Sequence, residues 1–438
     1  MTSLGLPPIA VALPILVLTY VLIMLDRFDR SIIALLGGAA MIFSGVLTQP
    51  QAIAGIDFNT IGLLTGMMLL VTISRRSGIF EFLAIWSAQA VRASPAGLLG
   101  ALALVTALLS ALLDNVTTVL LVAPVTIAIT RRLRVPPFPF LVAEVMASNF
   151  GGTATLIGDP PNILIGSAAP LSFNQFLVHL TPVVAVVVGV QLLVLHFWQG
   201  RGMGAAPGAR AEIMAMRARE NILDSRLLRH ALAVFALVLV GFCTTRFSGL
   251  EPGTIALAGG AGLMLLENLI HPRDAQFRKI TATYGEVDWI TIFFFVGLFI
   301  VVQGVQATGA LEWVAHRVTS ATHGDLALTV AVVLWTAAIL SAVIDNIPFV
   351  AAMIPVIHAM APEFGGAEGI LPLWVALSLG ACFGGNGTLI GASANLTVAG
   401  LAQREGIPFG FFLYTRHALP LTVVSVGIAH IYLYLRYL

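Results

Sequence analysis

The sequence predicts an all-α polytopic membrane protein of two inverted-topology repeats, with about ten spanning helices, two re-entrant helical hairpins and two broken helices. Three observations support this fold class. Hydrophobic residues make up 58% of the 438 residues and charged residues only 10%, whereas a soluble domain is roughly a quarter charged. Apolar runs near the roughly 17 to 25 residues that cross a bilayer recur along the chain. The second half also repeats the polar and glycine pattern of the first.

The repeat is clearest at polar and glycine positions that interrupt apolar sequence. The pair Asp114-Asn115 recurs 231 residues later as Asp345-Asn346. At shifts of 231 or 233 residues the matches continue with Asp57 and Asp288, Gly66 and Gly297, Gly151-Gly152 and Gly384-Gly385, Thr155 and Thr388, and Asn162 and Asn395. So many matches at a nearly constant shift are not expected by chance, so each half is predicted to be one structural repeat.

Each repeat is expected to contain the same elements in the same order. A first helix, a second helix and a third helix with an amphipathic arm precede a hairpin around the Asp-Asn pair, a broken helix and a last helix. If each hairpin returns to its starting face, five elements cross, and an odd number inverts the second repeat. The expected boundaries are 1–200 for the first repeat (hairpin 95–134, broken helix 138–170), 201–229 for a cytoplasmic linker, and 230–438 for the second repeat (hairpin 325–361, broken helix 370–403).

Basic residues predict the orientation, because lysine and arginine accumulate in cytoplasmic loops. With the first residue outside, the predicted cytoplasmic segments hold all but three of the 22 lysines and arginines, Arg27 and Arg30 included. The three left outside are Arg246, Arg317 and Arg436. This pattern predicts a bacterial inner membrane protein with both termini periplasmic, in which the first hairpin opens inward and the second outward.

Asp114 and Asp345 are the strongest candidates for a functional role. Each lies between apolar runs, in LLDNVTT and VIDNIPF, where a charged side chain costs at least roughly 2.5 to 3.5 kcal/mol. One interpretation is that each aspartate only caps the second arm of its hairpin. Both roles can hold together, because a buried acid at a hairpin tip is also suited to reversible protonation. Two such acids in register exceed what capping requires.

Paired glycines interrupt the helix that follows the hairpin in each repeat, at 149–162 and 384–395, and the first of these segments also contains Pro160-Pro161. Broken backbone at membrane depth must line a cavity or bind a ligand. The alternative is that the glycines serve a tight helix crossing. That alternative leaves Asp159, Asn162, Thr388 and Asn395 unexplained. Asp159 has no acidic counterpart, since Ala392 and Ser393 stand nearby in the second half, so the site is expected to be asymmetric in charge.

These patterns define one set of residues expected to bind substrate or couple protons. The set is Asp114, Asn115, Thr117, Thr118, Gly151, Gly152, Thr153, Thr155, Asp159, Asn162, Asp345, Asn346, Gly384, Gly385, Asn386, Thr388, Ser393 and Asn395. Glu144 and Glu267 are expected at helix ends or interfaces. The two cysteines suggest no metal site, and no nucleotide loop or nucleophile-base spacing is present. We therefore expect no enzyme activity, no cofactor, no bound metal and no nucleic-acid partner.

Four segments resemble a known group of transporters. DNVTTVLLVAPVTIAI, AEVMASNFGGTATLIGDPPNILIGSA, DNIPFVAAMIPV and ACFGGNGTLIGASAN look like the arsenite permease and melanosomal P protein branch of the ion transporter superfamily. More distantly, the chain is similar to sodium/proton antiporters of the D type and to divalent-anion:sodium symporters. The resemblance implies a scaffold that dimerises and a moving transport unit made of both hairpins and both broken helices. In the symporters a serine stands where Asp114 and Asp345 lie here, and the two extra charges oppose an anionic substrate.

The leading hypothesis is proton-coupled efflux of arsenite or antimonite by an elevator-type alternating access. A neutral trihydroxide would be held by hydroxyl, amide and backbone groups, and Asp114 and Asp345 would exchange protons. A sodium/proton antiporter would use the same oxygens, and an anion permease or channel of the same superfamily would need no proton exchange. Besides the lipid bilayer and the substrate, a homodimer partner and a separate soluble ATPase subunit are compatible with the sequence.

Overall fold

The computed structural model describes every residue except 1, 3–4, 26, 170, 201 and 270–271. All regular elements within this described part are helices. The first half holds α1 (Pro8–Met24), α2 (Arg30–Phe43), α3 (Gln49–Ala54), α4 (Phe58–Arg75), α5 (Ile79–Ala90), α6 (Pro95–Ser110), α7 (Asn115–Leu133), α8 (Phe138–Thr153), α9 (Pro160–Ala168) and α10 (Phe173–Leu195).

The linker carries α11 (Pro207–Met214), and the second half repeats the order of the first. Its helices are α12 (Ser225–Cys243), α13 (Thr245–Ser248), α14 (Pro252–Asn268), α15 (Arg273–Gly285), α16 (Trp289–Gln306), α17 (Ala310–Ala321), α18 (Leu326–Val343), α19 (Asn346–Met360), α20 (Leu371–Gly384), α21 (Ser393–Arg404) and α22 (Phe411–Tyr437).

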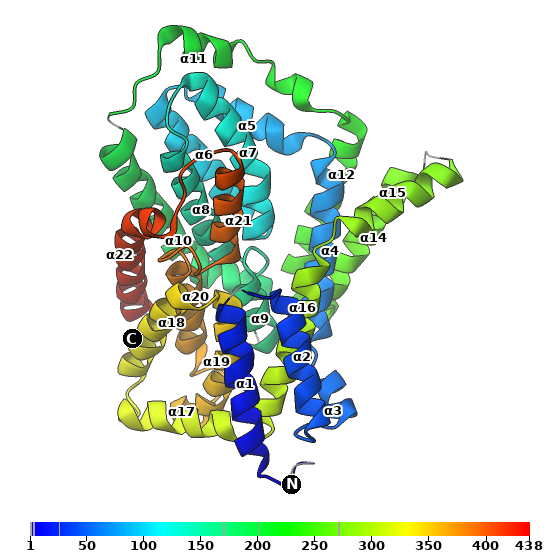
Figure 1. The fold of residues 1–438 in the computed structure, drawn as a ribbon, viewed down its shortest axis with the longest axis vertical. Helices are drawn as coiled ribbons and strands as arrows, with labels where there is room; N and C mark the ends of the chain where they lie inside the picture. Colours follow the sequence, from blue (N-terminus) through cyan, green and yellow to red (C-terminus); the bar gives the residue numbers. More distant parts are fainter. Residues whose placement is uncertain (1, 3–4, 26, 170, 201, 270–271) are drawn as a thin grey trace.

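The two halves have opposite orientations, as predicted. Figure 1 shows the α6–α7 hairpin on the side of α11 at the top and the α18–α19 hairpin on the side of α17 at the bottom. Eight helices in the described residues are long and apolar enough to cross a membrane. Shorter apolar helices, such as the 14-residue α2, complete the bundle. The prediction of an all-helical membrane fold of two inverted repeats is therefore confirmed.

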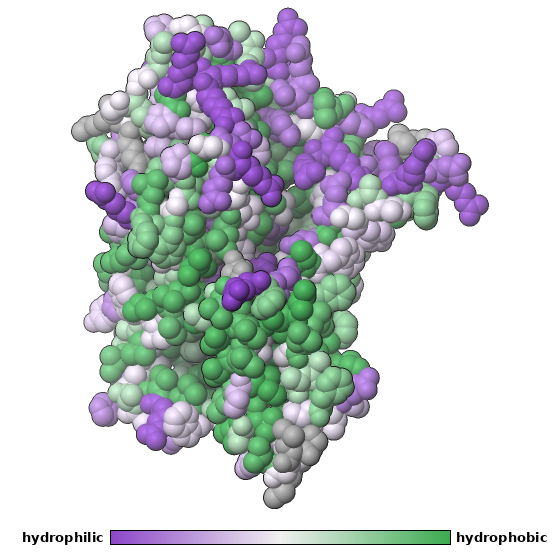
Figure 2. Space-filling view, in the orientation of Figure 1, coloured by the Kyte–Doolittle hydropathy of each residue, from purple (hydrophilic) through white to green (hydrophobic). Residues whose placement is uncertain are grey.

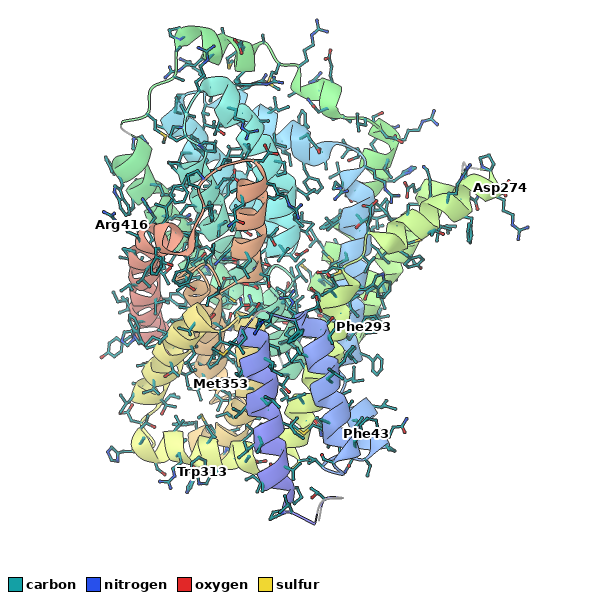
Figure 3. The ribbon with its side chains drawn as sticks, in the orientation of Figure 1. Phe43, Asp274, Phe293, Trp313, Met353 and Arg416 are labelled. Carbon is teal, nitrogen blue, oxygen red and sulfur yellow. The ribbon has the colours of Figure 1, made fainter. Side chains whose placement is uncertain are left out.

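The surface shows where a bilayer would lie. Figure 2 shows hydrophobic residues over the middle and lower parts of the molecule, and hydrophilic residues gathered over the linker and α15 at the top. In Figure 3, Asp274 lies at the tip of the projecting α15, whereas Phe293 lies on the outer side of α16, where it is 49% exposed. Exposed apolar side chains around the waist and polar ends are typical of a lipid-embedded bundle.

One group of helices, which we call the scaffold group, consists of α1–α4 and α12–α16. Within it, α4 packs on α14 and α2 packs on α16. A Cβ atom added to Gly66 would lie 2.3 Å from the carbonyl carbon of Ala256, and one added to Gly297 would lie 2.3 Å from that of Ala34. Small residues let helix backbones approach this closely. Because Gly66 and Gly297 are repeat partners, the same crossing is built twice.

Apart from the linker helix α11, the remaining helices, α5–α10 and α17–α22, form what we call the hairpin group. Here α6 packs on α8 and α18 packs on α20. Gly151 and Gly384 face the carbonyl oxygens of Ala107 and Ala338 at these crossings. The tight-crossing interpretation therefore holds for these two glycines, although the helices also break a few residues later. In addition, α7 contacts α21 and α19 contacts α9, so each hairpin packs on the broken helix of the other repeat.

The turn between α1 and α2 lies near mid-height of the molecule, next to the hairpin group (Figure 1). The 14 residues of α2 rise only about 21 Å, less than the roughly 30 Å of a hydrocarbon core. The helix therefore begins well inside the molecule. The expectation that Arg30 belongs to a cytoplasmic loop is wrong, because its guanidinium lies 3.3 Å from Asp345.

Candidate functional site

An amide network joins the two repeats at the centre of the hairpin group. The side-chain amide of Asn149 on α8 donates to Asn386 and to Asn395, at 2.9 Å each, and accepts from Asn115 at 3.0 Å. Asn115 also donates to Asp159 at 3.3 Å. All five side chains are buried. The network brings together four of the predicted residues, while the central Asn149 was not among them.

Asn162 and Asn395 each hold the break of their own repeat. The side-chain amide of Asn162 donates to the carbonyl oxygens of Thr153 and Thr155 at 3.0 and 2.9 Å. Asn395 donates to those of Gly385 and Thr388 at 2.8 Å each. These bonds satisfy backbone groups that a broken helix leaves without partners. Because both N–H groups of each amide are engaged, we expect the two asparagines to shape the site more than to bind substrate.

This arrangement predicts that Asn162→Ala lowers stability. The change leaves two buried carbonyls without donors, and each such group costs about 1 to 3 kcal/mol. We expect a clear drop in the apparent melting temperature of the detergent-purified protein, followed by tryptophan fluorescence. Thr117→Ala is the matched control, because the hydrogen bonds of Thr117 go to the carboxylate of Asp114 and not to a carbonyl oxygen of a broken helix. Equal melting temperatures for the two variants would contradict this role for Asn162.

A small cavity of about 30 Å³ lies between the scaffold group and the two hairpin tips. Its walls carry three carboxylates, one guanidinium, two asparagine amides and two hydroxyl groups. The lining residues are Arg30, Leu64, Met68, Asp114, Asn115, Val116, Asp159, Pro160, Asp288, Thr291, Asn346, Ile347 and Ser393. The predicted candidates Asp114, Asn115, Asp159, Asn346 and Ser393 therefore meet at one cavity.

Asp159 is the most enclosed acid of the cavity. It precedes α9 in extended conformation and is fully buried. One carboxylate oxygen accepts from Asn115, and the other has no hydrogen-bond partner among the described residues. A buried oxygen without a donor is costly, so this atom is available to a proton or to a bound substrate.

Asp114 and Asp345 occupy equivalent positions but differ in their partners. Asp114 caps α7 by accepting the backbone N–H of Thr117 at 2.8 Å, and no described basic side chain forms an ion pair with it. Asp345 caps α19 by accepting the N–H of Ile347 at 3.0 Å. It also accepts from Ser393 at 3.0 Å and pairs with Arg30 at 3.3 Å. Both aspartates are thus caps, and only Asp345 has a counter-ion.

Other predicted residues support the backbone around the cavity. The hydroxyls of Thr118 and Thr153 donate to carbonyls of their own helices, those of Asp114 and Asn149. Those of Thr155 and Thr388 donate to Ala111 and Ala342, at the ends of α6 and α18. The glycines of each break approach one another, Gly152 with Gly158 and Gly385 with Gly391.

Two charged residues, Glu144 and Arg30, lie where the sequence did not predict them. Glu144 was expected at a helix end or interface, but it is fully buried in the middle of α8 and accepts a hydrogen bond from Thr126. Arg30 was assigned to a loop and instead lines the cavity. Two features of the sequence could have indicated this place for Arg30. An aspartate between apolar runs, such as Asp345, requires a cationic partner, and the apolar run that follows Arg30 is short.

Two inverted hairpins and two broken helices around a buried acidic cavity define a membrane transporter. The family model described as "CitMHS: Citrate transporter" matches residues 20–380. The chain therefore belongs to this transporter family. The expected place in the ion transporter superfamily is confirmed.

Similar proteins support the family and the fold. An uncharacterized transporter of Mycobacterium tuberculosis is 42% identical over 431 residues, with 98% of each chain covered. The P protein of Sus scrofa is 32% identical over 506 residues, which cover 97% of this chain and 59% of that protein.

Among solved structures, the YdaH transporter of Alcanivorax borkumensis matches with a TM-score of 0.61 at 17% identity, over 98% of both chains. MtrF of Neisseria gonorrhoeae matches with a TM-score of 0.54 at 11% identity, over 98% of this chain and 95% of that one. At these identities the two structures establish a shared fold.

Proposed function

We propose that the protein is a proton-coupled secondary transporter that exports arsenite or antimonite from the cytoplasm by an elevator-type movement of the hairpin group. The observation that carries the proposal is the composition of the cavity. Asp114, Asp159 and Asp288 face a single guanidinium, that of Arg30. Excess negative charge in a buried site favours a neutral or cationic substrate and the uptake of protons.

Charge and size both weigh against a large anion in this cavity. Citrate, which the family description names, carries carboxylates that three aspartates would repel. The cavity of about 30 Å³ exceeds the roughly 10 to 15 Å³ that a cavity needs to hold one water molecule, but it is far smaller than the roughly 300 to 1,000 Å³ of pockets for drug-sized ligands. A small inorganic solute is therefore a better match than a tricarboxylate, and expansion of the cavity by a few side-chain movements would admit it.

A trihydroxide of arsenic or antimony offers three O–H groups, each a donor and an acceptor. The carboxylates of Asp114 and Asp159 supply acceptors, and Asn346 and Thr291 supply an amide and a hydroxyl group around the same space. Asn115 supplies its amide oxygen, because its N–H groups already donate to Asn149 and Asp159. Asp114 is the preferred proton carrier of the proposal, because it borders the cavity and has no basic partner among the described residues. Asp159 is a second titrating group.

A sodium/proton antiporter is the second candidate. Carboxylate and amide oxygens are ligands for hard cations as well as hydrogen-bond acceptors, and the cavity concentrates both kinds. The third candidate from the sequence is an anion permease or channel. An acidic cavity supports this function least of the three.

The proposed setting is a bacterial inner membrane with both termini periplasmic. The linker with its arginines lies at one end of the molecule, and the N-terminus lies at the other (Figure 1), as expected if lysine and arginine mark the cytoplasmic face. A homodimer and a separate soluble ATPase subunit remain predictions of the sequence.

The proposal is tested with purified protein in liposomes loaded with a pH-sensitive dye under an imposed proton gradient. Separate batches receive arsenite, sodium or citrate, and protein-free liposomes provide the background. Proton movement with arsenite and not with sodium is the expected result. Proton movement with sodium alone would mean that the substrate is a cation and not a metalloid. Proton movement with citrate alone would overturn the argument from charge and size.

A further inference from the structure

Arg30 lies between two hollows of the protein. On one side is the cavity of about 30 Å³, and on the other is a larger pocket of about 260 Å³, which we call the vestibule. The vestibule is lined in part by Asp29, Arg30, Asp345, Ile390, Ser393 and Leu396. Arg30 and Ser393 belong to both hollows. Their side chains therefore form part of the wall between them.

The guanidinium of Arg30 also joins the two groups of helices. One nitrogen donates to Ser393 at 2.6 Å and lies 3.3 Å from Asp345, both in the hairpin group. The other nitrogen donates to Thr291 at 3.1 Å in the scaffold group. The ring of Phe294 on α16 lies 5.2 Å beneath the guanidinium, close enough for a cation–π contact. Three polar contacts and one aromatic face fix the position of this side chain.

Arg30 breaks the symmetry of the repeats. Ala34 and Ala256 are equivalent, since they meet the equivalent glycines Gly297 and Gly66. Counting back four residues from each alanine pairs Arg30 with Pro252. The second repeat therefore has no cation to offer Asp114 at this position, and a matched structural contact cannot explain Arg30.

We propose that Arg30 is a gate and a built-in counter-ion that latches the hairpin group to the scaffold group through Asp345. With Asp345 charged and no cargo present, the ion pair closes the cavity toward the vestibule and holds the two groups together. Protonation of Asp345, or the arrival of cargo that competes for it, releases Arg30 and lets the hairpin group move. This inference rests on the proposed function and adds a reason why an empty, unprotonated carrier would not leak.

Several acidic groups surround Arg30. Asp345 contacts it directly from α19. Asp288 is one step away, because it accepts a hydrogen bond from Thr291 at 2.6 Å. Asp29 precedes it on its own turn, and Asp114 and Asp159 line the same cavity. All of these groups are acidic, so the charge around the guanidinium attracts it and holds it in place.

The gate is tested by thiol labelling, which needs no knowledge of the substrate. Met68→Cys places a reporter on the cavity wall away from the vestibule, and Leu396→Cys places one in the vestibule. Both are made in a Cys243→Ser background, with the buried Cys382 retained. A membrane-impermeant maleimide is expected to label the Met68→Cys reporter at least about tenfold faster after Arg30→Gln, the factor that corresponds to 1.4 kcal/mol. Labelling at Leu396→Cys is expected to stay the same.

Three further variants make the result decisive. Asp345→Asn, which mimics the protonated acid, is expected to open the gate as Arg30→Gln does. The labelling rate of Arg30→Lys is expected to lie between those of the wild-type protein and Arg30→Gln. Arg27→Gln is the control, since Arg27 is exposed on the same turn. Unchanged labelling of the Met68→Cys reporter in both Arg30→Gln and Asp345→Asn would overturn the gate.

A transport measurement on the same proteins separates the gate from the proposed function. If wild-type protein couples arsenite or sodium to protons, Arg30→Gln is expected to retain downhill flux and lose most of the protons moved per substrate. Intact coupling in Arg30→Gln would overturn the counter-ion role. If wild-type protein moves no protons with either solute, the proposed function fails, while the labelling result still decides whether Arg30 closes the cavity.

Discussion

Asp114→Asn is expected to abolish proton-coupled flux and to leave the protein folded. The asparagine side chain keeps an oxygen that can accept the N–H of Thr117, so the cap of α7 survives. It cannot exchange a proton at any pH in the physiological range. Loss of a group that transfers protons typically reduces a rate by about 100-fold or more. Dye-reported proton flux in liposomes, normalised to the amount of folded protein, measures this loss.

The control for this variant is Asp57→Asn. Asp57 caps α4 in the same manner, accepting the N–H groups of Asn59 and Thr60 at 3.0 and 3.2 Å. Its repeat partner Asp288 lines the cavity, whereas Asp57 does not. Asp57→Asn should therefore retain coupling. Wild-type proton coupling in Asp114→Asn would remove this aspartate from the mechanism, and equal losses in both variants would point to an effect on folding.

The architecture was predictable because inverted repeats leave a pattern that survives in one chain. The recurrence of Asp114-Asn115 as Asp345-Asn346 identified two equivalent hairpin tips, and α7 and α19 indeed begin at the two asparagines. Glycine pairs marked the ends of α8 and α20 in the same way. Helix breakers and buried acids act locally, so their consequences for the backbone can be inferred from sequence.

The partners within the site could not be predicted, because they depend on contacts between distant segments. Asn149 has Cys382 at its repeat position, so nothing in the repeat pattern singled it out. Arg30 and Asp345 are 315 residues apart, and the arginine follows a charged stretch that is typical of a loop. The sequence marks Asn162 and Asn395 as polar residues near the breaks, but only the structure shows their amides bound to backbone carbonyls.

The second large effect is expected at the glycine crossings of the hairpin group. A Cβ atom on Gly151 would lie 2.1 Å from the carbonyl oxygen of Ala107, and one on Gly384 would lie 2.3 Å from that of Ala338. Both obstacles are helix backbone, which cannot rotate away as a side chain can. Overpacking of this kind typically costs about 1 to 3 kcal/mol and sometimes more. Gly151→Ala and Gly384→Ala are each expected to lower the apparent melting temperature and to reduce proton-coupled flux.

Gly100→Ala is the control that separates this steric effect from the general effect of replacing a glycine within a helix by alanine. Gly100 lies on α6, the helix that Gly151 crosses, and a Cβ atom there would meet nothing within 4 Å. Alanine favours helix over glycine by roughly 0.5 to 1 kcal/mol, so Gly100→Ala should leave the melting temperature unchanged or raise it. Opposite signs for Gly100→Ala and Gly151→Ala would show that α6 and α8 are held together by backbone contact. A loss of stability in all three variants would instead show that an added methyl group is destabilising even where it meets no neighbour, and the close contact at the two crossings would then not explain the effect of Gly151→Ala and Gly384→Ala.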